Sequence, residues 1–122
     1  MSGKGFSRAL RIEELLHRRI AEIILRHQER AAFVGVTITS TKVSPDLSHA
    51  KIFVTLLDET KIEKSIQNLN LEVKFLRHIL AKDLNLRFVP HLLFVYDSSI
   101  RYGERLDALI NAAILSDAAK SH

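Results

Sequence analysis

The chain of 122 residues contains no cysteine. This absence excludes a disulfide framework, a thiol nucleophile and a zinc site built on cysteine, and it fits a reducing compartment such as the cytoplasm. Every apolar run is far shorter than the roughly 20 residues that a membrane-spanning helix needs. No apolar segment follows Met1-Ser2-Gly3-Lys4-Gly5, so we expect no secretory signal.

Sequence signatures of catalysis are missing as well. The four glycines, at positions 3, 5, 35 and 103, form neither a G-x-x-x-x-G-K nor a G-x-G-x-x-G phosphate loop. No G-x-S-x-G nucleophile elbow is present, and the six histidines include no H-x-x-x-H pair that would favour a metal site. Asp46 and Asp97 both stand beside predicted turns, where aspartate commonly bonds local backbone. We therefore expect no enzymatic activity, no metal and no cofactor.

The residues that are present predict one globular domain with a three-stranded sheet. Apolar residues make up 47% of the chain and charged residues 26%, which is ordinary for a soluble domain. Period-two patterning rich in β-branched residues predicts strands over 34–39 and 50–57. Ser44-Pro45-Asp46-Leu47 suits a type I turn between them, because Pro45 presets φ at the second turn position. Leu92–Tyr96, after Pro90, is the third predicted strand.

Helical periodicity surrounds these strands. An apolar stripe predicts a helix over 7–30 with Ser7 as its N-cap. Thr60-Lys61-Ile62-Glu63 resembles a capping box that opens a second long helix. A last helix is expected from about Tyr102 or Gly103 to Leu115, and the segments 1–6 and 116–122 are expected to be flexible. The predicted fold is therefore α+β, with helices packed on one face of the sheet.

The net charge is +4, from 18 basic and 14 acidic residues, and its placement matters more than its size. The two long helices and the turn into the third strand carry most of the lysines and arginines. If the two basic helix faces lie side by side, they form one patch that can neutralise phosphates with a strong salt dependence. Pairs such as Glu14–Arg18 also fit a merely solvated helix face. Phe53 fits either an RNA-stacking ring or ordinary packing.

Several strings then carry a family resemblance, in chain order: Ser7-Arg8-Ala9-Leu10-Arg11, Val43-Ser44-Pro45-Asp46-Leu47, Ala50-Lys51-Ile52-Phe53-Val54, Phe75-Leu76-Arg77, Leu86-Arg87-Phe88-Val89-Pro90, Leu92-Leu93-Phe94, Asp97-Ser98-Ser99 and Gly103. With these strings, the chain resembles the ribosome-binding factor A (RbfA) family over roughly residues 6–115. The resemblance implies a KH-like fold of the second type, α-β-β-α-β with a C-terminal helix. It also implies a protein without catalytic activity.

The resemblance further implies binding to the free small (30S) ribosomal subunit, help in late maturation of 16S rRNA and a role in cold adaptation. A ribosome-assembly GTPase is a further partner to consider, and we expect a cytoplasmic monomer without membrane contact. The residues expected to contact rRNA are the basic ones on the helices and nearby strand ends: Arg8, Arg11, Arg18, Arg19, Lys42, Lys51, Lys74, Arg77, Lys82, Arg87 and Arg101.

Two positions depart from the family pattern. The family has A-x-G at a kink within the second helical segment, whereas Glu72-Val73-Lys74 stands here, so a kink there is expected to be milder or shifted. The family often ends the first helix with D-P-R, and Glu29-Arg30-Ala31 stands here, so that helix is expected to run a turn longer.

A second hypothesis is a protein-interaction module without direct RNA contact. Its partner would bind the exposed sheet face, with Phe53, Leu93 and Val95, or a sheet edge. Salt separates the two hypotheses, because affinity that rests on phosphates falls steeply with salt and an apolar contact hardly changes.

Overall fold

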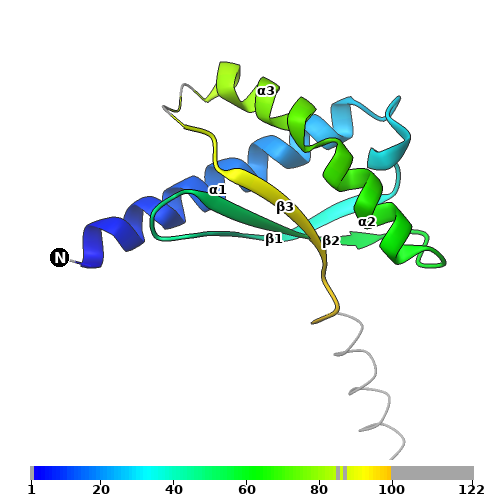
Figure 1. Cartoon of the computed structure of the whole chain (residues 1–122), viewed down its shortest axis with the longest axis horizontal. Helices are drawn as coiled ribbons and strands as arrows, with labels where there is room; N and C mark the ends of the chain where they lie inside the picture. The colour runs from blue at the N-terminus through cyan, green and yellow to red at the C-terminus, as the bar shows by residue number, and fades with distance from the viewer. Residues whose placement is uncertain (1, 85, 87, 100–122) are drawn as a thin grey trace, which may run out of the picture.

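The computed structural model describes residues 2–84, 86 and 88–99 (Figure 1). Its elements, in chain order, are helix α1 (Ser2–Arg26), 3-10 helix η1 (Ala31–Phe33), strands β1 (Val36–Val43) and β2 (His49–Leu56), helices α2 (Ile62–Leu71) and α3 (Val73–Asp83), and strand β3 (His91–Tyr96). The predicted C-terminal helix and tail lie outside the described residues.

The sheet has the order β1-β2-β3. Strand β2 pairs antiparallel with β1, from Val36 opposite Leu56 to Val43 opposite Ala50, and parallel with β3. The register shifts between Ile38 and Ser40, which makes Thr39 the extra residue of a β-bulge. Helices α1, α2 and α3 lie on one side of this sheet (Figure 1). The predicted α+β fold and its three strands are confirmed.

The core forms where the alternating strand residues meet the helix stripes. Ala50, Ile52, Val54 and Leu56 of β2 are buried, because side chains two apart on a strand share one face. They belong to one cluster with buried residues of all three helices, among them Leu16, Ile20, Leu69, Leu76 and Leu80. The opposite sheet face, which carries Lys51 and Phe53, is not covered by any described helix.

Helix α1 differs from its predicted bounds at both ends. It begins at Ser2, so Ser7 lies within it, and the prediction of an N-cap at Ser7 was wrong. It ends at Arg26, so the longer run to about Arg30 was also wrong. Gln28 explains this end, because its side-chain amide donates to the carbonyl of Ile24 at 2.6 Å and to that of Phe33 at 3.2 Å. A side-chain donor thus satisfies a carbonyl that the helix leaves open, and the chain turns back to bury Phe33.

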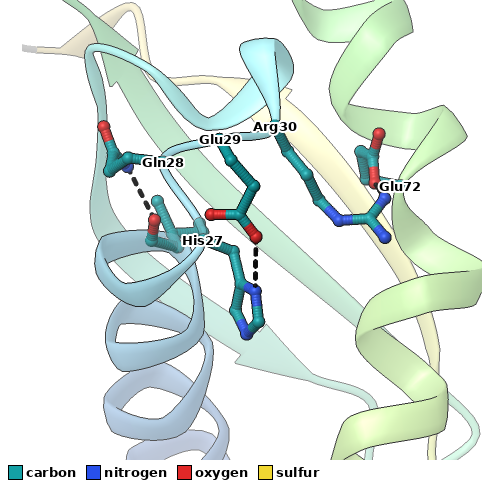
Figure 2. Close-up of polar contacts among 6 residues, drawn as sticks. His27, Gln28, Glu29, Arg30 and Glu72 are labelled. Atoms are coloured by element: carbon teal, nitrogen blue, oxygen red, sulfur yellow. Dashed lines mark hydrogen bonds and ion pairs between the residues drawn. The ribbon is translucent and has the colours of Figure 1, made fainter.

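The second predicted helix is two helices, interrupted at Glu72 (Figure 1). Glu72 has φ −87° and ψ −2°, a conformation that needs no glycine. Its Oε2 pairs with Nη1 of Arg30 at 2.5 Å (Figure 2). The Arg30 guanidinium also lies 3.4 Å from the ring centroid of Phe75, and the His27 ring meets that ring edge-on. Arg30 and Glu72 each belong to a segment that departs from the family pattern, and the two side chains contact each other at the helix break.

The start of α2 also differs from the prediction. Thr60 was expected to cap the helix, but its hydroxyl donates to Oδ1 of Asp58 at 2.7 Å instead. Lys61 occupies the N-cap and its side chain makes no capping hydrogen bond. The Asp58 carboxylate also accepts from the backbone N–H of Thr60 at 3.0 Å, so Thr60 belongs to the turn before the helix.

Helix side chains bond the outer backbone of both edge strands. On β3, the Asn70 amide accepts from the backbone N–H of Phe94 at 2.8 Å and donates to its carbonyl at 3.2 Å. On β1, the carboxylate of Glu13 accepts from the N–H of Val43 at 2.9 Å. These contacts occupy backbone groups that an added strand would need, so they disfavour docking of a partner at either edge.

Candidate nucleic-acid interface

A groove of about 750 Å³ lies where four segments meet: the first half of α1, the β1–β2 turn, helix α3 and the chain between α3 and β3. We call it the arginine groove, because Arg8 and Arg11 of α1 and Arg77 of α3 line it. Leu86, Phe88, Val89 and Pro90 form its apolar side, and Asp46, Leu47 and Ser48 form its turn side; Ile12 and His91 complete the lining.

The three arginines differ in how they are held. Arg8 and Arg11 are exposed and stand three residues apart, so they share one face of α1. Arg77 is half-buried, and its Nη2 donates to the carbonyl of Val89 at 3.0 Å. Its Nε is buried and has no acceptor among the described residues, so the contact with Val89 leaves donor capacity unused. The groove therefore combines two exposed cations with one anchored cation.

The apolar side of the groove ends in an exposed aromatic ring. Pro90 is buried and Val89 half-buried, whereas Phe88 is 77% exposed. Guanidinium groups pair with phosphates, and aromatic or apolar side chains accept the face of a base. Such a combination in one groove suits a nucleotide better than an inorganic anion or an apolar ligand.

The turn side of the groove is built around Asp46. The predicted turn is confirmed, because the N–H of Leu47 donates to the carbonyl of Ser44 at 2.9 Å. Leu47 follows with φ +63°, an uncommon conformation for a branched residue. Oδ1 of Asp46 accepts from the hydroxyls of Ser44 and Ser48, both at 2.7 Å, and from the N–H of Ser48. The carboxylate therefore fixes the turn that closes the groove.

These bonds predict an acid-dependent part of the stability. The hydroxyl of Ser48 first, and then that of Ser44, lower the pKa of Asp46 from 3.8 to about 2. The pKa of Asp46 is lower in the folded protein than in the unfolded chain, so its ionised form stabilises the fold. This contribution to the free energy of unfolding is fully present above about pH 3.8 and is lost as the pH falls through about 2. We expect Asp46→Ala to melt below the wild type at pH 6, with a difference that shrinks between pH 4 and pH 2.

Thermal unfolding followed by circular dichroism across this pH range measures the effect. Gln67→Ala, at an exposed position that does not titrate, is the control and should differ from the wild type by the same amount throughout. A difference between Asp46→Ala and the wild type that stays constant down to pH 2 would contradict the prediction.

The other cations predicted on the helices lie apart from the groove. Arg18 borders a separate hollow with Glu13, Glu14 and His17. Arg19 pairs with Glu22 of its own helix at 2.6 Å and with Asp83 of α3, and the bond to Asp83 raises the pKa of Arg19 further above its ordinary value. Arg19 therefore connects α1 to α3 and has less capacity for phosphate than an unpaired arginine. Lys74 and Lys82 are exposed on α3.

The cations predicted on the strands lie on the sheet face away from the helices. Lys42 and Lys51 stand directly opposite each other in the β1–β2 ladder, and both are exposed. Phe53 follows on the same face of β2 and is half-buried. Arg87 and Arg101 lie outside the described residues. The predicted single basic wall is thus divided. Of the predicted cations that the structure describes, it brings Arg8, Arg11 and Arg77 together in the arginine groove.

Two features of the groove region were missed in the sequence. Phe88 was read only as part of a family string, although an aromatic residue two before a proline in a connecting segment could have indicated an exposed ring. His91, at the groove, pairs with His49 across the parallel β2–β3 ladder, with 5.4 Å between ring centroids. Positions 49 and 91 are far apart in the chain, so the sequence alone did not predict that the two histidines are neighbours.

The part of the chain that the structure describes contains no group of three or more histidine, cysteine or acidic side chains placed to hold a metal ion. In the same part, each helix is either too short or too polar to cross a lipid bilayer.

Comparison with known proteins relates this architecture to one family. The family model of ribosome-binding factor A matches residues 8–110. A ribosome-binding factor A from Pseudomonas aeruginosa is 41% identical over 117 residues, which span 93% of this chain and 91% of that protein. The crystal structure of ribosome-binding factor A from Thermus thermophilus matches with a TM-score of 0.62 and 25% identity, over 72% of this chain and 94% of that one.

A homology model of the Thermus thermophilus factor, fitted into a cryo-EM map of a 30S–RbfA complex, also has this fold. It matches with a TM-score of 0.59 and 24% identity, over 72% of this chain and 93% of that one. The family model covers most of the chain, and the Pseudomonas relative exceeds 40% identity over nearly its whole length. This chain therefore belongs to the ribosome-binding factor A family.

Proposed function

We propose that this protein is a ribosome assembly factor that binds the free 30S subunit and assists the late maturation of 16S rRNA. Membership of the ribosome-binding factor A family supports this proposal at the level of ribosome binding. A relative from Thermus thermophilus has been fitted into the map of a 30S complex, which supports the small subunit as the partner.

One observation in this chain carries the proposal: arginines from two helices far apart in the sequence converge on one groove. Arg8 and Arg11 come from α1, Arg77 comes from α3, and all three line the same hollow. When clustered arginines neutralise phosphates of an RNA, the counterions condensed on that RNA are released, and this release favours binding. The exposed lysines of α3, Lys74 and Lys82, extend the positive surface beyond the groove.

The proposed mechanism is binding without a chemical step. The protein would hold an immature rRNA conformation through phosphate contacts and leave when the mature conformation no longer offers them. A ligand with higher affinity for one state shifts the population toward that state, in proportion to the difference in affinity. In this proposal the protein acts as a cytoplasmic monomer without a cofactor, supports growth in the cold, and is displaced with the help of an assembly GTPase.

Co-sedimentation with purified ribosomal particles tests the proposal. We expect the protein to pellet with free 30S subunits and to remain in the supernatant with 70S ribosomes and 50S subunits. Because several phosphate contacts are involved, raising the salt from 50 to 200 mM should lower the affinity by about two or more orders of magnitude. Equal retention on all three particles, or on none at low salt, would reject the proposal.

The open sheet face supports a second candidate function. Leu93 on this face is 48% exposed beside Lys51, so an apolar and basic strip is available to a partner protein. The edge version of this hypothesis is weaker, because Asn70 and Glu13 occupy backbone groups of the outer strands. If the affinity for 30S subunits hardly changes between low and moderate salt, docking through this face becomes the better explanation.

A further inference from the structure

We propose that the arginine groove takes a single unpaired nucleotide of an RNA strand, with its phosphate against Arg8 and Arg11 and its base against Phe88. This inference rests on the proposed function, since it names the kind of RNA element that the same groove would bind. Three properties of the groove carry it: its size, its charge and its exposed ring.

The size of the groove suits one nucleotide. Its volume of about 750 Å³ falls within the range of roughly 300–1,000 Å³ that is typical of small-molecule sites. A base within a duplex is stacked on both faces and paired at its edge, so it offers no face to a side chain. Single-stranded loops and bulges, by contrast, present bases that can leave the stack and enter such a site.

The charges in the groove give the nucleotide one orientation. Arg8 and Arg11 lie on the α1 side, where exposed guanidinium groups can pair with phosphate oxygens. The turn side carries Asp46, which is ionised at neutral pH like any aspartate and is held in place by hydrogen bonds from Ser44 and Ser48. Its negative charge repels a phosphate there. The phosphate therefore belongs at α1, and the base extends into the rest of the groove.

The apolar side then receives the base. Phe88 offers an exposed ring at a groove that already contains cations, and stacking on such a ring tolerates any base because every base has a π-face. Pro90 is buried beneath this side and Arg77 donates to the carbonyl of Val89, so the base of this wall is held in place. Holding these two residues reduces the conformational entropy that binding would otherwise cost.

The test compares two RNA hairpins by fluorescence anisotropy, using the full chain. One hairpin carries a single unpaired 2-aminopurine in its stem, and the other has a uridine opposite the same base so that it is paired. We expect the wild type to bind the bulged hairpin roughly five- to a hundredfold more tightly than the paired one. The emission of 2-aminopurine should rise on binding, as the base leaves the stack.

Substitutions locate the stacking ring. Phe88→Leu should remove the preference for the bulge, and Phe88→Tyr should keep it. Because position 88 is exposed, we expect both variants to have the melting temperature of the wild type, which serves as the folding control. Phe53→Leu, on the open sheet face, should keep the full preference. Loss of the preference in Phe53→Leu but not in Phe88→Leu would overturn the assignment to the groove.

The outcomes separate this inference from the proposed function. If the wild type binds both hairpins equally well and Arg8→Ala weakens both, the groove binds phosphates without selecting an unpaired base, and only the further inference fails. If neither hairpin nor the 30S subunit binds at low salt, both fail. Preference for the bulge that depends on Phe88 supports the inference.

Discussion

Removing both exposed arginines of the groove should weaken 30S binding by about a hundredfold. The double variant Arg8→Ala with Arg11→Ala deletes two cations on one face of α1, and each charge-assisted bond to a phosphate contributes roughly 1.5 kcal/mol. The two side chains are exposed, so we expect the fold to tolerate the change. Equilibrium binding to fluorescently labelled 30S subunits, repeated at several salt concentrations, measures both the affinity and its salt dependence.

The salt dependence is the sharper readout. Each lost phosphate contact reduces the slope of log K against log salt by about 0.7–1, so the double variant should have a slope shallower by roughly 1.4–2. The matched control is Arg26→Ala with Lys64→Ala, which removes the same net charge at exposed positions outside the groove. If the control loses as much affinity and slope as the groove variant, the groove is not the contact surface and binding reflects net charge alone.

Asn70→Leu should lower the free energy of unfolding by roughly 2–4 kcal/mol. The side-chain amide of Asn70 bonds both backbone groups of Phe94, whose side chain is 1% exposed. Leucine removes both bonds and leaves a donor and an acceptor on the outer edge of β3 without partners. An unsatisfied buried group costs about 1–3 kcal/mol, and the better helix propensity of leucine offsets only a small part of this loss. Urea denaturation followed by circular dichroism measures the change.

Asn68→Leu provides the comparison on the same helix. Asn68 is exposed, so leucine there should change the stability by less than about 0.5 kcal/mol. Similar stabilities for the two variants would show that the contact with Phe94 contributes little.

The strands were predictable because their signal is local. Ala50, Ile52 and Val54 recur at every second position of a stretch rich in β-branched residues, and their burial on one face follows from that period. The turn at Ser44–Leu47 was predictable for the same reason, since Pro45 and Asp46 act on their immediate neighbours. The ends of α1 and the start of α2 were mispredicted, because side chains of Gln28 and Asp58 intervene that a propensity argument ignores.

The arginine groove, our candidate site, could be predicted from the sequence in its basic character but only partly in its position. Basic residues on the helices were identified, yet the sequence placed them on one wall, whereas the structure divides them between the groove, the α1–α3 contact and the open sheet face. Arg19 shows the reason: its acidic partner Asp83 is 64 positions away in the chain. Periodicity identifies the face of a helix, but not the neighbour that this face meets.

Local residue patterns were enough to specify the three strands, the turn, the basic character and the family of this protein, because each of these depends on neighbouring residues or on strings in a fixed order. The remaining features required the packed chain. The second predicted helix is interrupted at Glu72, whose side chain pairs with Arg30, a residue 42 positions earlier in the chain. The Asn70 side chain accepts from the backbone N–H of Phe94 at the edge of β3. The groove exists only because packing of α1 and α3 on one sheet brings Arg8 and Arg11 to the same hollow as Arg77. Contacts between distant residues depend on how the elements pack, and no local pattern encodes them.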